Sequence, residues 1–449
     1  MAYIVPFRAL RYNPERVSLA ETVTQPYDKI SPAMQQRYYA ASPFNLVRII
    51  LGKHEPGDGA EENVYTRAAT SFRDWRRQGV FRQDSEPSIY VYAQRFVVPG
   101  TRTEMERRGF IALGRLEDYS AGVVFRHEQT LTRPKADRLA LLRATRAHFG
   151  QIFMLYRDSG EIDRLVAQNT APLVAITDEY GVLHRLWRVF DAGVLASVCA
   201  RMRDKQLIIA DGHHRYETAL NYRDERRAAT TQSSGALDAH PREPGVLPPF
   251  EGSYPPHDFL MMTFVNMEGR GVVILPTHRV VHGLPSFSAE SFGASARAYF
   301  NLEEVDPAID PARAAAILGQ AGQVGAAFLA ATASRVFLLH TPKAPPDLFP
   351  GWSLRQQALD VVQLHQVVLE RVLGLSPEAI RNQQNLAYVR EAGEALAAVR
   401  GGSANVAFLM NPCRMERVRD LALAGEVLPQ KSTDFYPKLL SGLTIYALE

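Results

Sequence analysis

The chain has 449 residues, which is enough for two or three domains with ordinary hydrophobic cores. Hydrophobic residues make up 46% of it and charged residues 22%, as is typical of globular proteins, and the 51 basic and 48 acidic residues nearly balance. This balance does not favour a nucleic-acid surface, no run approaches the roughly 20 apolar residues that span a membrane, and no signal peptide is evident, so we expect a cytoplasmic protein.

The first half of the chain alternates predicted helices and strands. Residues 66–78 have the apolar spacing of an amphipathic helix, and Gly79 is suited to its left-handed cap. Residues 89–98 and 108–116 predict an antiparallel pair of strands. We then expect, in order, a helix over 134–149, a strand over 152–156, a hairpin from 173–176 and 183–187, and a helix over 195–202.

The most informative stretch follows. An apolar strand-like run, Leu207 to Ala210, ends at Asp211, and a helix-compatible segment over 213–227 begins two residues later. The free N–H groups and positive dipole end of a helix favour anions. His213, His214 and Arg215 would add positive charge there, with Arg215 able to hold a phosphate through two hydrogen bonds. Asp211 is the candidate Mg²⁺ ligand. The alternative is a buried Asp that caps the helix, with histidines that only pack.

The remaining chain predicts the domain organisation. Residues 228–257 are rich in Ser, Thr, Gly and Pro, which is typical of a flexible loop that serves as a spacer or as a lid over the site. Strands are expected over 259–265, 271–275 and 406–410, and Ala-rich helical patterns between 286 and 400. We predict an α+β (mixed α/β) fold, with the motif at the edge of a small mixed sheet. Its segments are an α/β amino-terminal segment (1–95), a central domain (96–285), an α-rich second domain or insertion (286–400), and a carboxyl-terminal segment that completes the site (401–449).

The motifs carry a resemblance to known families. Residues 211–215, Asp-Gly-His-His-Arg after a strand, resemble the signature of the ParB/sulfiredoxin-like superfamily, which includes nucleotide-dependent free-serine kinases, sulfiredoxin and CTP-binding partition proteins. Over nearly its whole length the chain is similar to domain-of-unknown-function family 1015. That resemblance covers Gln25-Pro26-Tyr27-Asp28, Asn45-Leu46-Val47-Arg48, residues 126–130, 134–138 and 211–215, and residues 429–433 with 435–438. It implies a ParB/sulfiredoxin-like central domain with additional α/β segments.

Glu128 and a basic helix start are the next candidates. A carboxylate beside a histidine can act as a general base. In the serine-kinase branch, a glutamate upstream of the motif removes the proton of the substrate hydroxyl, and Glu128 is most similar to it in local context. The alternative is a surface ion pair with Arg126 or Arg133. Lys135 and Arg138, three residues apart on a predicted helix, would either neutralise phosphates or simply be solvated.

Two further groups of polar residues complete the predicted site. Lys431, Ser432 and Thr433, with Lys438 and the pair His278 and Arg279, are predicted to bind phosphate, although Lys431 lacks a preceding glycine-rich Walker loop. Asp28, Asn45 and Arg48 are candidate substrate ligands, with Asp28 suited to an amino group and Arg48 to a carboxylate. A structural role in a Pro-flanked turn is the alternative for Tyr27-Asp28.

We therefore hypothesise a nucleotide-dependent phosphotransferase that uses ATP or ADP and Mg²⁺ to phosphorylate a small hydroxyl metabolite such as free serine. A phosphomonoester hydrolase on the same anion site is the first alternative, and a non-catalytic nucleotide-binding switch is the second. The sequence lacks Gly-x-Ser-x-Gly, Gly-x-Gly-x-x-Gly and helical zinc spacings, and no cysteine stands in the motif for sulfinic acid chemistry. Cys199 and Cys413 are predicted to be buried apolar residues.

Overall fold

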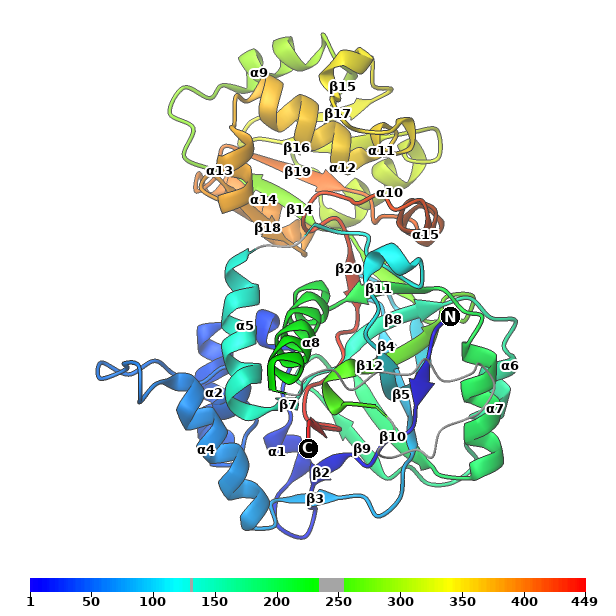
Figure 1. Cartoon of the computed structure of the whole chain (residues 1–449). Coiled ribbons are helices and arrows are strands. Elements are labelled where there is room, and N and C mark those ends of the chain that lie inside the picture. Colours follow the sequence, from blue (N-terminus) through cyan, green and yellow to red (C-terminus); the bar gives the residue numbers. More distant parts are fainter. Residues whose placement is uncertain (130–131, 234–253) are drawn as a thin grey trace. The chain divides into compact units, whose positions relative to one another are not determined.

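The computed structural model describes residues 1–129, 132–233 and 254–449, which fall into two compact units. Unit 1 comprises Met1–Arg126, Thr130–Val272 and Pro437–Glu449, and unit 2 comprises His127–Gln129 and Val273–Tyr436. Figure 1 shows the elements of each unit.

Unit 1 is built on a nine-stranded mixed sheet in the order β6-β11-β8-β12-β5-β4-β10-β9, with β1 paired to β5. The pairs β11–β6 and β12–β8 are parallel, and the others are antiparallel. Two small ribbons, β2–β3 and β7–β21, complete the strands of its described residues. The strands are β1 Ile4–Val5, β2 Leu10–Tyr12, β3 Phe81–Gln83, β4 Ile89–Val97, β5 Glu104–Arg115, β6 Val124–Phe125, β7 Ala147–His148, β8 Ile152–Tyr156, β9 Val174–Thr177, β10 Leu183–Val189, β11 Leu207–Asp211, β12 Phe259–Asn266 and β21 Tyr446–Ala447.

Amphipathic helices cover the hydrophobic surfaces of unit 1. Leu195, Val198 and Met202 of α7 pack into the core formed by β4, β8 and β12. A second core joins α4 to α5 through Phe72, Trp75 and other apolar residues, and α8 lies beside α5 (Figure 1). The helices are α1 Leu19–Thr22, α2 Pro32–Ala41, α3 Val47–Ile50, α4 Val64–Arg77, α5 Thr132–Thr145, α6 Glu161–Leu165, α7 Ala192–Met202 and α8 His213–Ser233, with 3₁₀ turns at Tyr27–Lys29, Tyr119–Ala121 and Pro256–Asp258.

Unit 2 contains a six-stranded antiparallel sheet in the order β15-β17-β16-β19-β14-β18, and a separate pair, β13–β20. Alternate residues of a strand point to opposite faces, and in β16 both sets are apolar and buried. Phe328 belongs to the core with α9 and the helix over 360–372, whereas Leu329 belongs to the core with α10 and α14. Helices therefore cover both faces of this sheet.

The elements of unit 2 have the following bounds. The strands are β13 Val273–Leu275, β14 His278–Val281, β15 Asn301–Val305, β16 Ala327–Ala331, β17 Val336–His340, β18 Leu386–Val389, β19 Val406–Met410 and β20 Asp434–Tyr436. The helices are α9 Ala289–Ala296, α10 Pro311–Ala321, α11 Leu354–Gln357, α12 Asp360–Gln363, a π-helix over Leu364–Val372, α13 Pro377–Asn382, α14 Ala392–Arg400 and α15 Met415–Leu423, with a 3₁₀ turn at Pro346–Leu348.

The mixed α/β fold class predicted from sequence is confirmed, but the predicted sizes and boundaries differ from the structure. The sheet that carries the motif has nine strands, so it is not small. β4 runs across the predicted 95/96 boundary because it pairs with β5 along its length. The region 286–400, predicted as α-rich, contains β15, β16, β17 and β18, since its alanines lie in buried strands as well as in helices. The predicted terminal segment 401–449 is divided between the two units.

The two ends of the predicted loop over 228–257 differ from the prediction. Residues 228–233 continue α8, because no Gly or Pro interrupts the helix before Gly235. Residues 254–257 lead through the turn at Pro256–Asp258 into β12. The rest of the predicted loop, residues 234–253, lies outside the described residues.

Candidate functional site

The motif occupies the junction of β11 and α8 in unit 1. β11 pairs with β8, and its register shifts between Ile209 and Asp211. A bulge of this kind re-aims the side chain that follows it. Gly212 then adopts φ +99°, a left-handed conformation that costs glycine little, and α8 begins at His213. The predicted strand-to-helix corner is thus confirmed, with a bulge and a glycine that set the direction of Asp211.

Asp211 lies between two cations. Its Oδ1 accepts a hydrogen bond from Lys438 Nζ at 3.0 Å, and its Oδ2 accepts one from the Arg215 guanidinium at 2.9 Å. Burial alone would raise the pKa of Asp211, but the charges of Lys438, Arg215 and Lys29 outweigh it and hold the pKa well below its usual range. Asp211 is therefore a carboxylate at neutral pH, and the charges that surround it most closely are cationic.

The guanidinium of Arg215 lies against two glycines. A Cβ at Gly150 would be 3.1 Å from Arg215 Nη1, and a Cβ at Gly212 would be 3.1 Å from its Nη2. Arg215 Nη1 also donates to the carbonyl oxygen of Gln151 at 2.6 Å. The group is thus fixed by one carboxylate and one carbonyl, and within the described part of the chain its other N–H groups have no hydrogen-bond acceptor. Those donors are available to a ligand.

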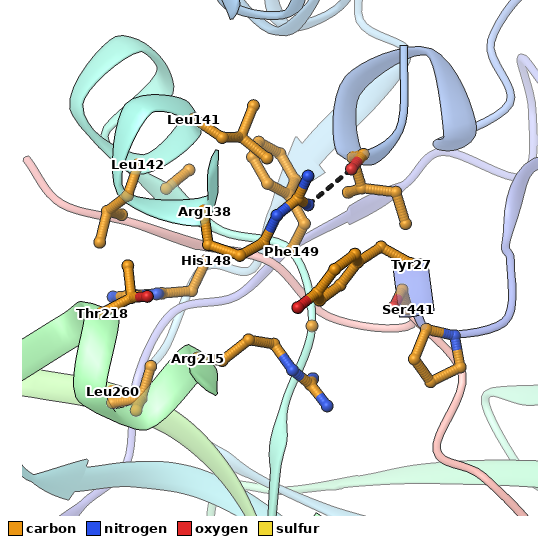
Figure 2. Close-up of a pocket in the computed structure, with 14 residues that line it drawn as sticks. Tyr27, Arg138, Leu141, Leu142, His148, Phe149, Arg215, Thr218, Leu260 and Ser441 are labelled. Carbon is orange, nitrogen blue, oxygen red and sulfur yellow. Dashed lines mark hydrogen bonds between the residues drawn. The ribbon is translucent and has the colours of Figure 1, made fainter. Parts of the chain in front are cut away.

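A pocket of unit 1 with about 580 Å³ of empty volume opens beside Arg215. Figure 2 shows Tyr27 between Arg138 and Arg215, with its hydroxyl directed between the two side chains. The Arg138 guanidinium carbon stacks 4.0 Å from the centre of the Tyr27 ring. Burial raises the pKa of Tyr27 to about 12, and the charges of both arginines oppose the rise. The remaining lining is Pro26, Ile50, Leu141, Leu142, Ala147, His148, Phe149, Gly150, Thr218, Leu260 and Ser441.

A buried hydrogen-bond network in unit 1 holds the segment that carries Lys438. Gln94 donates to the carbonyl oxygen of Lys438 at 2.8 Å, and Arg107, which is 1% exposed, donates to Gln94 and to the carbonyl oxygen of Pro437. The Tyr92 hydroxyl accepts from the amide of Leu440 at 3.4 Å. Since the backbone on both sides of Lys438 is fixed, its ammonium is placed at Asp211 with little freedom.

The other predicted cations of unit 1 have partners of their own. Lys135 Nζ pairs with Glu217 at 2.9 Å, and Glu217 also lies 3.4 Å from Arg126. Arg138 donates to the Ile50 carbonyl oxygen at 2.6 Å and to the carboxylate of the neighbouring Asp137. His213 is buried and His214 is half-buried in the first turn of α8. Of these residues, Arg138 lines the pocket beside Arg215, and the others do not.

The predicted substrate ligands Asp28, Asn45 and Arg48 lie outside the lining of this pocket. Asn45 is 1% exposed, and its side chain donates to the Glu21 carbonyl oxygen and accepts from the Val47 amide, as a turn residue does. Arg48 stacks on the Tyr39 ring and donates to the Tyr39 carbonyl oxygen. Asp28 is exposed. A substrate role for these three residues remains a prediction.

The remaining predicted residues belong to unit 2. Glu128 Oε1 accepts a hydrogen bond from the Lys431 amide at 2.6 Å, where Lys431 adopts φ +57°. Next to it, the Thr433 hydroxyl contacts His127 Nε2 at 2.7 Å, and Ser432 donates to the Pro429 carbonyl oxygen. These contacts fix the loop over 429–433, and the role of Glu128 as general base and of the loop as a phosphate ligand remain predictions.

His278 and Arg279 lie on β14 and are both buried. His278 Nδ1 accepts from the Met410 amide at 3.1 Å, so it links β14 to the end of β19. Arg279 donates to the carbonyl oxygens of Thr277 and Lys431. Neither residue shares a unit with Asp211.

Several residues that line the unit 1 pocket or support the Asp211 cluster were not predicted from the sequence. Tyr27 and Lys29 flank the predicted ligand Asp28, and in the structure Tyr27 lines the pocket while the charge of Lys29 acts on Asp211. Gly150 and Ser441 were not predicted because neither carries a charge, although Gly150, two residues before the strand over 152–156, allows a close approach of Arg215. Arg107 lies just before the predicted strand over 108–116, and only the structure shows that it belongs to β5 and is buried.

The donor set around Asp211 does not fit a metal ion held by protein groups alone. Each carboxylate oxygen already accepts from a cation, and no group of three or more His, Cys, Asp or Glu residues that could hold a metal is found in residues 1–129, 132–233 and 254–449. Mg²⁺ binding remains a prediction, and no chemical step is derived through it. In the same described ranges, no helix is both long and apolar enough to cross a bilayer.

Comparisons with known proteins give a family and distant structural likenesses. A family model described as "Protein of unknown function (DUF1015)" matches residues 4–362. A conserved hypothetical protein from Pyrococcus furiosus is 13% identical, with a TM-score of 0.35 over 72% of this chain and 92% of that chain. A free serine kinase in complex with AMP is 13% identical, with a TM-score of 0.32 over 71% and 88%. SbnI with C-terminal truncation from Staphylococcus aureus is 10% identical, with a TM-score of 0.35 over 75% and 87%. No curated protein matches the sequence. At these identities and TM-scores the likenesses assign no function.

Proposed function

The chain belongs to the DUF1015 family, and because the description of that family names no function, we propose one from the geometry of unit 1. We propose that unit 1 binds the phosphates of a nucleotide, ATP or ADP, and transfers a phosphoryl group to a small hydroxyl compound such as free serine. The observation that carries this proposal is that Arg138 and Arg215 line one pocket, on either side of Tyr27. Arg215 also donates a hydrogen bond to Asp211, which pairs with Lys438.

The charge of the site supports a phosphate ligand. The charges of Lys438, Arg215 and Lys29 all lower the pKa of Asp211, so the surroundings of this carboxylate are cationic. Arginine N–H groups match phosphate oxygens in direction and number. The glycines at 150 and 212 allow the close approach of the Arg215 guanidinium, and its hydrogen bonds to Asp211 and Gln151 hold its remaining donors in place before a ligand arrives.

The rest of the pocket supports a ligand with an apolar or aromatic part. Leu141, Leu142 and Phe149 form its wall, and Tyr27 offers an aromatic face on which Arg138 already stacks. Small-molecule sites commonly combine such a wall with a few fixed polar groups. A nucleotide has both parts, because its base is flat and weakly polar while its phosphates are anionic.

The chemistry requires positioning more than covalent participation by the protein. The bond between the transferred phosphorus and the leaving phosphate oxygen breaks, and a bond to the acceptor hydroxyl oxygen forms. The leaving phosphate gains negative charge, which Arg215 and Lys438 would stabilise, and the acceptor hydroxyl loses its proton to a base. Asp211 is a weak base because its pKa is held low, so in unit 1 its role is to position Arg215 and Lys438.

An Arg215→Ala variant tests the proposal. Loss of a charge-assisted contact of about 1.5–3 kcal/mol predicts roughly 10- to 100-fold weaker ADP binding by calorimetry. Arg143→Ala is the matched control, because Arg143 lies on α5 in an exposed ion pair with Glu225 and does not line the pocket. Unchanged ADP affinity in Arg215→Ala would refute the assignment.

Product analysis then separates transfer from hydrolysis. With ATP or ADP and free serine, a phosphotransferase forms phosphoserine and the shortened nucleotide in equal amounts. A phosphomonoester hydrolase instead releases inorganic phosphate from phosphoserine, with no need for a nucleotide. Nucleotide binding without either product would leave the non-catalytic switch as the function of this site.

A further inference from the structure

A second pocket lies wholly within unit 2. It has about 1130 Å³ of empty volume and is lined by the start of β14, the turn after α10, the start of α12, the end of β19 and the start of α15. Four of its lining residues are charged: Arg279, Arg414 and Arg417 carry positive charge, and Asp360 is the one carboxylate among them. The residues of this pocket are distinct from those of the nucleotide site proposed in unit 1.

Arg279 supplies a buried positive charge to this pocket. It is 2% exposed, and burial lowers its pKa to about 10, so it is still a cation at neutral pH. Its guanidinium donates to two backbone carbonyl oxygens and lies 5.4 Å from the centre of the Tyr388 ring. The charge of Glu128 also acts on it, but among the described residues no direct ion pair joins the two. Its Nε has no hydrogen-bond partner there either. A buried cation without an ion-pair partner is costly, so an anionic ligand at this position would be favoured.

Two more guanidinium groups stand at the pocket's opening. Arg414 and Arg417 are exposed at the beginning of α15, a nine-residue helix that no side chain caps at its amino end. The free N–H groups and the dipole of such a helix end attract negative charge, and the two arginines add to it. Arg414 donates to the Gly322 carbonyl oxygen at 3.1 Å, and in the described part of the chain neither arginine forms an ion pair.

The two walls of the pocket are held together independently of any ligand. Asn411 donates to the Leu318 carbonyl oxygen at 2.9 Å, which joins the loop after β19 to the end of α10. A Cβ at Gly322 would lie 2.5 Å from Asn411 Nδ2, so the close approach of the two segments requires glycine. These contacts of Asn411 hold the segment before Arg414 against the turn over 319–325 without a ligand.

From this geometry we propose that unit 2 binds a small anionic metabolite through a compact oxyanion group, a carboxylate or a phosphate. Arg279, Arg414 and Arg417 hold the oxyanion, and Val324, Val361 and Met410 contact the body of the molecule. A carboxylate and a phosphate share the negative oxygens that these donors recognise, so separate probes distinguish the two sources.

Asp360 should make anion binding in this pocket depend on pH. Burial raises the pKa of Asp360 to about 6, and the nearby Arg414 opposes the rise. Below that pH its neutral carboxyl can donate to an oxyanion, whereas above it a second negative charge opposes binding. The other titratable groups of the pocket do not change charge near neutral pH, because the pKa of Cys413 is raised to about 12 and that of Arg279 is about 10.

The proposal is tested on the full chain by calorimetric titration with sulfate, inorganic phosphate and succinate at constant ionic strength. The Arg414→Ala/Arg417→Ala double variant should bind the preferred anion at least tenfold more weakly. Arg419→Ala is the matched control, since Arg419 lies on the same helix, pairs with Asp420 and does not line the pocket. A response to succinate alone identifies a carboxylate ligand, and a response to phosphate and sulfate identifies a phosphate ligand.

Asp360→Asn provides the second, independent readout. Sulfate does not titrate between pH 5 and 8, so its affinity should fall in the wild type as pH rises through about 6 and stay constant in the variant. Unchanged anion affinity in the double variant, or no saturable binding of any of the three probes, would overturn the proposal. Both outcomes are distinct from a failure of the nucleotide site, because that site is tested by Arg215→Ala in unit 1.

Discussion

Replacement of Asp211 by Asn tests whether the cationic cluster of unit 1 is a binding site or only a structural ion pair. The substitution keeps the shape of the side chain but removes its negative charge. In the wild type, Lys438 Nζ lies 3.0 Å and the Arg215 guanidinium 2.9 Å from the carboxylate oxygens of Asp211. The side chains are 9% exposed for Lys438, 17% for Arg215 and 22% for Asp211, so water compensates the two cations only in part.

The expected cost follows from these contacts. Removing one partner of a buried ion pair typically costs about 3–5 kcal/mol. The partial exposure of Asp211 and the hydrogen bonds that an amide oxygen retains reduce this figure, so we expect a loss of about 2–4 kcal/mol in the free energy of unfolding of unit 1. Because the pKa of Asp211 is lowered, its contribution is present above the unfolded-state value of about 3.9 and is lost as pH falls below it. The difference from wild type should therefore shrink in acid.

The discriminating measurement is urea unfolding with and without inorganic pyrophosphate at constant ionic strength. A binding site that loses its internal carboxylate becomes a stronger anion site, so pyrophosphate should restore more stability to the variant than it adds to the wild type. Asp84→Asn is the control, because Asp84 is also buried and pairs with Arg11 but does not line the pocket beside Arg215. Equal effects of pyrophosphate on wild type and both variants would refute the reasoning and leave the cluster a structural ion pair.

Three other predictions follow from the same structure. Arg138→Ala should weaken ADP binding about tenfold by calorimetry with little loss of stability, since its guanidinium lies at the pocket wall against Tyr27; an unchanged affinity would remove Arg138 from the site. Gly212→Ala should cost about 1–3 kcal/mol and weaken ADP binding, because a Cβ there meets the Arg215 guanidinium, whereas Gly181→Ala, which has a similar positive φ and open space, should lose stability alone. Burial lowers the pKa of His365 to about 3, so the unfolded chain gains a proton as pH falls below about 6.5 while the folded one does not; His365→Leu should therefore reduce the destabilisation of unit 2 at pH 5 by about 2 kcal/mol in urea titrations.

The local elements of the motif could be predicted because their signals lie close together in sequence. The apolar run over 207–210 and the glycine after Asp211 predict a strand, a turn and a helix without reference to the rest of the chain. The helix over 64–77 could also be predicted, since its buried residues recur with helical spacing, although the structure begins it two residues before the predicted start at residue 66.

The partners of these residues could not be predicted, because they depend on distant segments. Lys438 is separated from Asp211 by 227 positions, and its approach depends on the backbone contacts that Gln94 and Arg107 make with residues 437–438. The neutralisation of Lys135 by Glu217 likewise depends on the packing of α5 against α8. A charged residue indicates a possible ligand contact, but only the fold shows whether another charge already satisfies it.

The internal ion pairs of unit 1 determine which contacts of a ligand can contribute to its binding free energy. A phosphate that binds Arg215 or Lys438 competes with Asp211 for the same donors, so its oxygens replace one anion by another and gain little net energy. Most of the binding free energy must therefore come from other contacts. These are the remaining N–H groups of Arg215 and the apolar wall of Leu141, Leu142 and Phe149. A bare phosphate engages only the first, whereas a nucleotide engages both. We therefore expect the proposed site to favour a phosphate attached to a flat apolar body over a simple anion, because Asp211 competes for the same donors.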